Sequence, residues 1–227
     1  MEIGVISDVH GNTVALDAVF ADMPAVDALA CAGDVVGYNP WHAECVAAVR
    51  ERSIPTVSGN HDRAVASETR FAFNSMAGAG VAHARETLTE DQIEWLRSLP
   101  TTRREFDGRV RIVHGHPENP DRYTYTGEFS PDLLGEEDVL VLGHTHVQGH
   151  ERFDEGVVMN PGSVGQPRDG DPPSPRPTSP RASATGSQKD AESPPDRRLP
   201  TARLPRFCRP HRPCPWRTER ARRGRSR

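Results

Sequence analysis

Short apolar runs alternate with longer stretches of helical periodicity in the first hundred residues. The run at 2–7 (EIGVIS) predicts a short buried strand, and the apolar positions along 13–23 predict a helix that packs on a sheet. A second apolar run at 28–32 predicts another strand, and the segment 42–52, which ends before Pro55, predicts a second helix. Strands and helices that alternate in this way are typical of a layered α/β domain.

The alternation continues to about residue 160. Thr89 and Gln92 have the spacing of a capping box, which predicts that a helix begins there. Turn-forming residues at 154–156 between two apolar runs indicate a hairpin. The further predicted elements are a strand at 55–58, helices at 74–88 and 89–98, strands at 109–113 and 139–142, and a hairpin over 153–159.

Polar clusters follow five of these strands directly. Their sequences are D-V-H, G-D, G-N-H-D, H-G-H and G-H-T-H. Ligands of open α/β sheets bind beyond the carboxyl ends of the strands, so we expect the five clusters to form one site. A single histidine is more often structural than functional, and only the whole set supports this prediction. The side chains concerned are Asp8, His10, Asp34, Asn60, His61, His114, His144 and His146.

The residue types in these clusters indicate a metal centre. Carboxylate and amide oxygens mixed with imidazoles suit intermediate divalent ions such as Mn²⁺, Fe²⁺, Co²⁺ or Zn²⁺. Two such ions bring four positive charges, of which Asp8 and Asp34 neutralise two, and a hydroxide and a phosphate ester oxygen can meet the rest. One ion alone would leave half of these ligands unused. The ligand set and its charge balance therefore predict two metal ions rather than one.

In this order, the five clusters resemble the motif set of the calcineurin-like metallophosphoesterase superfamily, and most of all its small prokaryotic members. The resemblance runs from Met1 to about Asp169. It implies an α/β fold in which a layered β-sandwich is flanked by helices, an αββα arrangement. It also implies a metal-dependent phosphoesterase that hydrolyses phosphomonoesters or phosphodiesters by attack of a metal-bridging hydroxide.

The resemblance further implies a role for each side chain. His61 would not bind metal but would lie over the phosphate, where it stabilises developing charge or protonates the leaving oxygen. Two divalent ions are implied, with Mn²⁺ favoured and Fe²⁺, Co²⁺, Ni²⁺ or Zn²⁺ also compatible, and Asp34 would bridge them. The other ligands would be Asp8, His10 and His146 for the first ion, and Asn60, His114 and His144 for the second.

Residues outside the motifs are expected to contact a small phosphate-ester substrate. Asn12 follows the first cluster, and Arg168 lies at the end of the resemblance, so both are predicted substrate contacts. Protein serine/threonine phosphatases of the superfamily have G-D-x-V-D-R-G, whose second Asp supports the catalytic histidine. Here Gly37 occupies that position. This difference argues against a protein phosphatase and leaves His61 without that partner.

Composition changes abruptly near residue 170. Residues 1–170 hold 13 arginines, no lysine and 27 acidic residues, a formal charge of −14, whereas residues 171–227 carry +10. The later segment has 12 prolines and neither valine nor isoleucine, so it is predicted to be a disordered basic tail. We interpret the change as a reading-frame shift in a GC-rich gene, with a natural disordered tail as the alternative. The second sheet is then expected to be incomplete at its C-terminal end.

Other classes of protein are disfavoured by the sequence. It has no basic leader and no apolar run of the ~18–20 residues that a membrane helix needs, which predicts a cytoplasmic protein without membrane contact. The acidic body repels nucleic acid, which is expected to bind only nonspecifically, through the tail. The alternative to an enzyme is a noncatalytic binding scaffold with the same fold, but retention of His61 and all the ligands argues against it. No pattern predicts an oligomeric state.

Overall fold

A computed structural model of the chain describes residues 1–67, 73–168 and 202–203. The smaller of its two sheets is built around β1 (Ile3–Ile6), whose four residues are all buried. β2 (Ala28–Cys31) pairs with β1 in parallel and β8 (Ala202–Arg203) pairs with it in antiparallel, which gives the order β2-β1-β8. Because β1 and β2 are parallel, the loops that follow them begin at the same edge of the sheet.

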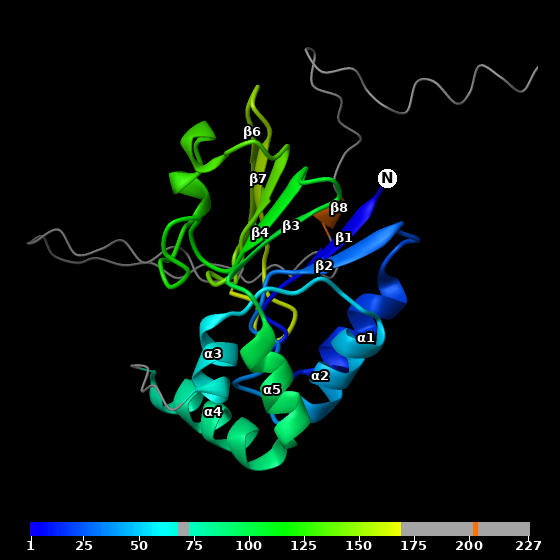
Figure 1. Cartoon of the computed structure of the whole chain (residues 1–227), viewed down its shortest axis with the longest axis vertical. Coiled ribbons are helices and arrows are strands. Elements are labelled where there is room, and N and C mark those ends of the chain that lie inside the picture. The colour runs from blue at the N-terminus through cyan, green and yellow to red at the C-terminus, as the bar shows by residue number, and fades with distance from the viewer. Residues whose placement is uncertain (68–72, 169–201, 204–227) are drawn as a thin grey trace, which may run out of the picture.

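Helices gather on one side of this sheet (Figure 1). Their apolar side chains pack against the sheet in a cluster that includes Ile6, Leu16, Val46 and Leu96, each at most 1% exposed. Burial of these side chains holds the helical layer to β1 and β2. The helices are α1 (Thr13–Asp22), α2 (His42–Glu51), α3 (Asn60–Ala66), α4 (Ser75–Thr87) and α5 (Glu90–Ser98).

The larger sheet has the strand order β3-β4-β5-β7-β6. Its three central strands run parallel, and the two edge strands pair with them in antiparallel. Both edge strands are polar in sequence (TRRE and QGHER), which protects the edges from pairing with other chains. The strands are β3 (Thr102–Glu105), β4 (Val110–Val113), β5 (Val139–Val141), β6 (Gln148–Arg152) and β7 (Val157–Pro161).

The two sheets pack face to face. Val5 and Ala30 of the smaller sheet meet Ile112 and Val141 of the larger sheet in one buried apolar cluster. The outer face of the larger sheet is covered by residues in and around two short 3₁₀ helices, η1 (Thr126–Glu128) and η2 (Pro131–Leu133). The predicted β-sandwich flanked by helices is thus confirmed in its coarse form, although the outer cover consists of 3₁₀ turns rather than long helices.

Four elements differ from those expected from the sequence. The predicted strand at 55–58 is only a bridge between Thr56 and Cys31. Helix α3 was not predicted because its first residues belong to a polar cluster, and β3 was missed because it lacks alternating apolar residues. The predicted hairpin exists but begins earlier, at Gln148, because its first strand is almost entirely polar.

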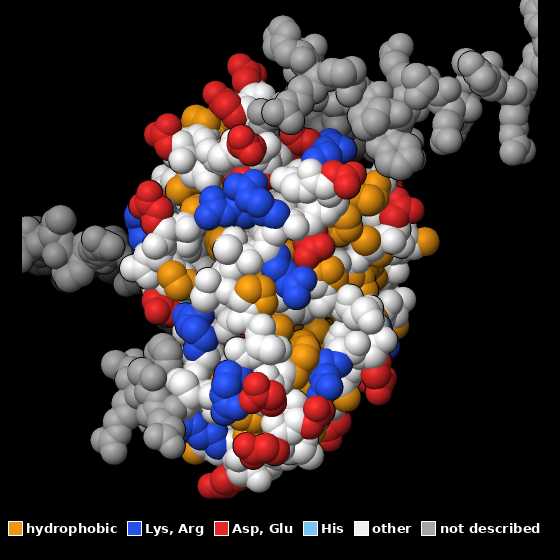
Figure 2. Space-filling view, in the orientation of Figure 1, with side chains coloured by type: hydrophobic (Ala, Val, Ile, Leu, Met, Phe, Trp, Pro, Cys, Tyr) orange, Lys and Arg blue, Asp and Glu red, His pale blue; other side chains and the backbone are white. Residues whose placement is uncertain are grey.

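Charged side chains of both signs are interspersed over the face seen in Figure 2. Arginines of the larger sheet pair with buried or half-buried acids, as Arg104 and Arg111 do with Glu137 at 2.9 and 3.9 Å.

Among the described residues, no helix is long and apolar enough to cross a membrane. The cytoplasmic location remains a prediction. The sequence predicts that the tail is disordered, that it arose by a frameshift and that strands of the second sheet are missing. Apart from β8, these predictions concern residues outside the described part of the chain.

Candidate metal centre

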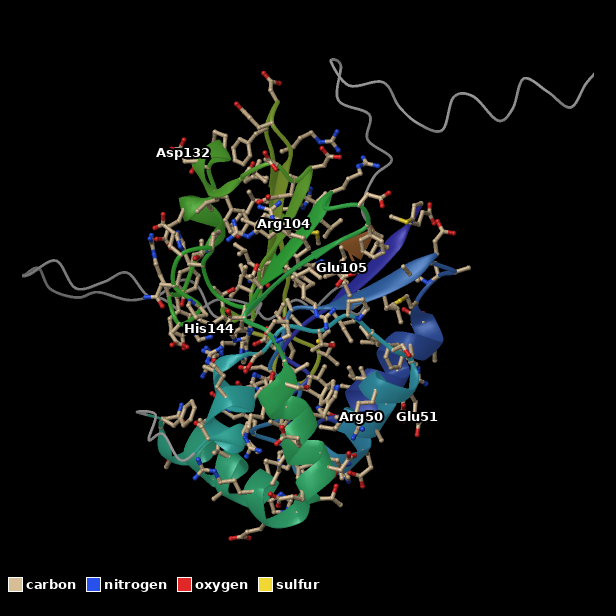
Figure 3. The ribbon with its side chains drawn as sticks, viewed as in Figure 1. Arg50, Glu51, Arg104, Glu105, Asp132 and His144 are labelled. Carbon is tan, nitrogen blue, oxygen red and sulfur yellow. The ribbon has the colours of Figure 1, made fainter. Side chains whose placement is uncertain are left out.

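Loops at one edge of the two sheets bring the predicted ligands together. β1 and β2 of the smaller sheet and β4 and β5 of the larger sheet end there, and each is followed at once by its polar cluster. Figure 3 shows His144 at the level where the strands meet the helical layer. Potential metal-binding atoms lie within 4.8 Å of one another in three overlapping buried groups. These are Asp8–His10–His146, His10–Asp34–His61 and Asp34–His114–His144.

The first group surrounds one oxygen of Asp8. Oδ1 of Asp8 lies 3.2 Å from Nε2 of His146 and 3.6 Å from Nε2 of His10, and it has no hydrogen-bond partner among the described residues. The other oxygen, Oδ2, accepts hydrogen bonds from the Ser7 hydroxyl (2.5 Å) and the His144 backbone N–H (3.1 Å). One carboxylate oxygen is therefore fixed by the protein, and the buried one without a partner fits a cation.

The tautomers of three histidines are set by backbone carbonyls. Nδ1 of His10 donates to Val36 O (3.1 Å), and Nδ1 of His146 donates to Gln166 O (2.7 Å). The Nε2 atoms of these two rings, only 3.0 Å apart, then both carry lone pairs when the rings are neutral. His114 donates its Nδ1–H to a carbonyl in the same way, at 2.7 Å. Lone pairs that face one another in a buried site are what a shared cation requires.

A second set of side chains, around His114, includes an amide oxygen. Oδ1 of Asn60 lies 3.2 Å from Nε2 of His114. In His144 it is Nε2, and not Nδ1 as in the other ligand histidines, that donates to a backbone carbonyl, that of Asp121 at 3.2 Å. In a neutral ring this leaves Nδ1 as the nitrogen available to a metal. The planes of the His114 and His144 rings are tilted by 53°, with centroids 4.8 Å apart.

Asp34 lies between the side chains around Asp8 and those around His114. Its Oδ2 is 3.3 Å from Nε2 of His114 and 3.8 Å from Nε2 of His10, while its Oδ1 accepts the backbone N–H of His61 at 2.8 Å. A single carboxylate thus contacts histidines of both groups. This is the position that a ligand shared by two ions must have.

The backbone at the centre is held in an uncommon conformation. Positive φ angles from 51° to 68° occur at five of the predicted ligands, none of which is glycine. Such angles are costly for residues with a Cβ atom and cluster at functional sites, where surrounding structure enforces them. The five residues are Asp8, His10, Asp34, His144 and His146.

Asp62 supports the loops from behind. Its carboxylate accepts the backbone N–H groups of Asp34 (2.8 Å), Val36 (3.2 Å) and Gly59 (3.0 Å), and its side chain is fully buried. A Cβ atom on Gly59 would collide with the Asp34 carboxylate, so this close approach requires glycine. Asp62 therefore fastens the loop after β2 to the start of α3.

Charges within the centre keep both carboxylates ionised. Burial alone would raise the pKa of Asp34, but the charges of His114 and His61 hold it far below its usual range. Burial would also raise the pKa of Asp8, yet His146 holds it well below the ordinary value. Burial would lower the pKa of His114, but the charge of Asp34 outweighs burial and raises this pKa to about 9. In the metal-free protein His114 therefore holds a proton that a cation would displace.

His61 lies beside these ligands. Its ring centroid is 4.8 Å from that of His10, 5.0 Å from that of Tyr38 and 4.6 Å from that of Phe73. Nδ1 is buried and has no hydrogen-bond partner among the described residues, as expected from the glycine at position 37. Burial lowers the pKa of His61 to about 4. Its ring is also within reach of the metal-binding atoms of His10 and Asp34, and its role apart from ligation stays a prediction.

The two predicted substrate contacts lie in different settings. Asn12 is the N-cap of α1, where its Oδ1 accepts from Ala15 N (3.0 Å) and its Nδ2 donates to Gly165 O (3.3 Å). Arg168 reaches the Tyr38 hydroxyl at 3.4 Å and forms no ion pair with a carboxylate in the described part of the chain. The guanidinium of Arg168 also donates to Gln166 Oε1 (3.2 Å), but its charge is not neutralised by a described carboxylate, so it can still meet an anion. Both polar atoms of the Asn12 side chain are bonded within the protein.

One neighbour of the centre has no counterpart in the sequence analysis. The ring of Tyr123 lies 4.0 Å from that of His144, with only 17° between their planes. Tyr123 comes from the stretch between the H-G-H cluster and β5, which carries no further motif and no regular apolar spacing. Only the spatial return of this segment to the centre, through Asp121 and His144, reveals it.

Comparison with known families agrees with this geometry. The model of the Calcineurin-like phosphoesterase superfamily domain matches residues 1–175. The chain belongs to this superfamily. The resemblance inferred from the five polar clusters is therefore confirmed, including its small phosphoesterase type.

Three relatives illustrate the membership. The protein MJ0912 of Methanocaldococcus jannaschii is 31% identical over 74% of this chain and 78% of its own length. Phosphodiesterase YfcE of Escherichia coli is 29% identical over 77% of this chain and 85% of its own length. The crystal structure of a metallophosphoesterase from Sphaerobacter thermophilus is 34% identical and superposes with a TM-score of 0.64, covering 75% of this chain and 79% of that one.

Proposed function

We propose that this chain hydrolyses phosphate esters with the help of two divalent cations, of which Mn²⁺ is the favoured one. The observation that carries the proposal is the place of Asp34, whose Oδ2 lies 3.3 Å from His114 and 3.8 Å from His10, between two sets of ligands. The relative YfcE is named a phosphodiesterase, which supports a phosphate ester as the substrate of this chain as well. Phosphomonoesters and phosphodiesters both fit this proposal.

The ligands divide into two sets in this proposal. When bound, the cations supply an acidified water, as hydroxide, and neutralise charge on the phosphate. Asp34 would hold both cations, and its Oδ1 is anchored to the His61 backbone N–H. The first set is Asp8, His10 and His146, and the second set is Asn60, His114 and His144.

His61 and Arg168 would contact the substrate itself. A neutral His61, with a pKa lowered to about 4 by burial, donates a hydrogen bond to a phosphate oxygen or to the leaving oxygen. The guanidinium of Arg168, which no carboxylate of the described residues neutralises, binds a phosphate oxygen that does not react. Asn12 stays a weaker proposal because its side chain caps α1.

A noncatalytic scaffold with the same fold is the second candidate. It would need neither the strained φ angles nor the buried polar cluster, both of which cost stability. The two candidates differ in one experiment, the assay of bis(p-nitrophenyl) phosphate and p-nitrophenyl phosphate with Mn²⁺, Ni²⁺ or EDTA. A scaffold binds metal but turns over neither ester.

Four variants sharpen this assay. Asp34→Asn and His61→Ala are expected to lower kcat at least about 100-fold, while the exposed controls Asp132→Asn and His150→Ala leave it unchanged. Metal analysis of His61→Ala should still find two ions per chain, because the ring acts on substrate in this proposal. Turnover that persists in EDTA and in both site variants would exclude a metal-dependent hydrolase.

A further inference from the structure

A strip of aromatic rings leads outward from the metal centre. The ring of Tyr123 stacks on His144 with 4.0 Å between centroids, and the ring of Tyr125 follows at 6.2 Å from Tyr123 with 13° between the planes. Tyr123 and Tyr125 expose 46% and 42% of their surfaces. We call these two residues the tyrosine strip. It presents exposed, nearly parallel rings directly beside a metal ligand.

The segment that carries the tyrosine strip is fixed to the rest of the site. The carbonyl of Asp121 accepts a hydrogen bond from Nε2 of His144 (3.2 Å), and its carboxylate forms an ion pair with Arg63 of α3. On the other side, Tyr125 donates its backbone N–H to Oε2 of Glu128 at 3.0 Å, where η1 begins. A surface that is already ordered loses little entropy when a ligand stacks on it.

A cation lies beside the metal centre. Arg168 reaches the hydroxyl of Tyr38 at 3.4 Å, and the ring of Tyr38 lies 5.0 Å from that of His61. The backbone N–H of Arg168 also donates to the carbonyl of the ligand His146, at 3.1 Å. A stacking surface and a cation that no described carboxylate neutralises therefore both border the ligands of the centre.

We propose that the tyrosine strip binds the planar base of a nucleotide whose phosphate is held at the metal centre. This inference rests on the proposed function, because the phosphate position comes from the metal ligands. Stacking suits a base because every base has a π-face, and it tolerates changes of base identity. Esters without an aromatic group gain nothing from Tyr123 and Tyr125. The substrate class would then be nucleoside phosphates rather than sugar or glycerol phosphates.

The test compares two ligands that differ in the base. Isothermal titration calorimetry of the full, Mn²⁺-loaded chain measures binding of AMP and of ribose 5-phosphate. AMP should bind about tenfold more tightly, the effect expected of one stacked base. Tyr123→Leu should abolish this preference, Tyr123→Phe should keep it, and Tyr125→Leu should reduce it. The control Trp41→Leu removes another exposed aromatic side chain, 40% exposed at the start of α2, and should leave the preference unchanged.

Base stacking by the tyrosine strip and hydrolysis at the metal centre are tested by different measurements. Equal affinity for AMP and ribose 5-phosphate, no binding of either, or a preference that survives Tyr123→Leu would each overturn the role of the strip. Absence of turnover with bis(p-nitrophenyl) phosphate and Mn²⁺ would instead overturn the proposed hydrolysis. Melting temperature and metal content of Tyr123→Leu, expected to match those of the parent chain, separate loss of stacking from loss of the centre.

Discussion

The backbone of Gly37 lies directly against the imidazole of His61. Gly37 has a φ angle of +106°, and a Cβ atom built on it would overlap Nδ1 of His61. The same nitrogen is buried without a hydrogen-bond partner among the described residues. The absence of a side chain at position 37 thus sets the place of His61, and no acid from this position can orient its ring.

Gly37→Ala is therefore expected to disturb His61. The added methyl group meets both an unfavourable φ and the imidazole, so we expect a loss of about 1–3 kcal/mol in unfolding free energy and a fall in kcat. Urea unfolding and steady-state kinetics measure the two effects. Gly78→Ala in α4 is the matched control, since a Cβ there meets no atom within 4 Å. A Gly37→Ala protein with normal stability and turnover would contradict the contact.

Asp62 should be essential for the stability of the loops. In Asp62→Asn, an amide NH₂ group replaces one of two oxygens that accept backbone N–H groups, which costs about 1–3 kcal/mol. The measurement is urea unfolding of the metal-free protein at pH 8, above the pKa of Asp62, which burial raises to about 6. Asp17→Asn, on the exposed face of α1, should have no effect. Equal destabilisation by both variants would argue against a role for these bonds.

Arg63 should influence the second metal through Asp121. It pairs with the Asp121 carboxylate and donates to Ser58 O at 2.9 Å, and the Asp121 carbonyl holds His144. We expect Arg63→Met to weaken one of two metal-binding steps by about tenfold, as loss of an outer partner of a ligand does. Competition with a chelating dye measures both steps. Arg50→Met, which removes an exposed pair with Asp91, is the control, and uniform weakening of both steps would count against the link.

Metal binding should stabilise the fold. Ions that bind the folded chain alone contribute about 2.7 kcal/mol at a concentration 100 times Kd, which corresponds to a rise in Tm of roughly 5–10 °C for a chain of this size. Differential scanning calorimetry of EDTA-treated protein with added MnCl₂ measures the rise. Asp34→Asn should lose most of it, because Asp34 contacts both groups of ligands. A rise of equal size in this variant would place the binding elsewhere.

Most of the residues gathered at the centre could be expected there from the sequence because most of them follow a strand closely. Asp8 and Asp34 come after parallel neighbours β1 and β2, so their proximity follows from strand direction alone. The meeting of these residues with His114 required that two sheets pack face to face. That arrangement came from the resemblance and not from periodicity, which shows where strands are but not which sheet they join.

Features set by the packing of loops could not be predicted. Tyr123 lies in a segment without motif, and only the hydrogen bond between Asp121 and His144 brings it to the centre. The orientation of the His144 ring, whose Nε2 donates to Asp121 O, depends on the same bond. Helix α3 was not expected because its first residues, Asn60 and His61, belong to a polar cluster. Local sequence does not predict contacts between loops that lie far apart along the chain.

The most direct test of a shared metal centre is a crystal structure of the Mn²⁺-loaded chain with anomalous scattering measured at the manganese edge. We expect two anomalous peaks roughly 3.5–4 Å apart, one beside Asp8 and His146 and one beside His114 and His144, with the carboxylate of Asp34 between them. A single peak, or two peaks that do not share Asp34, would contradict it.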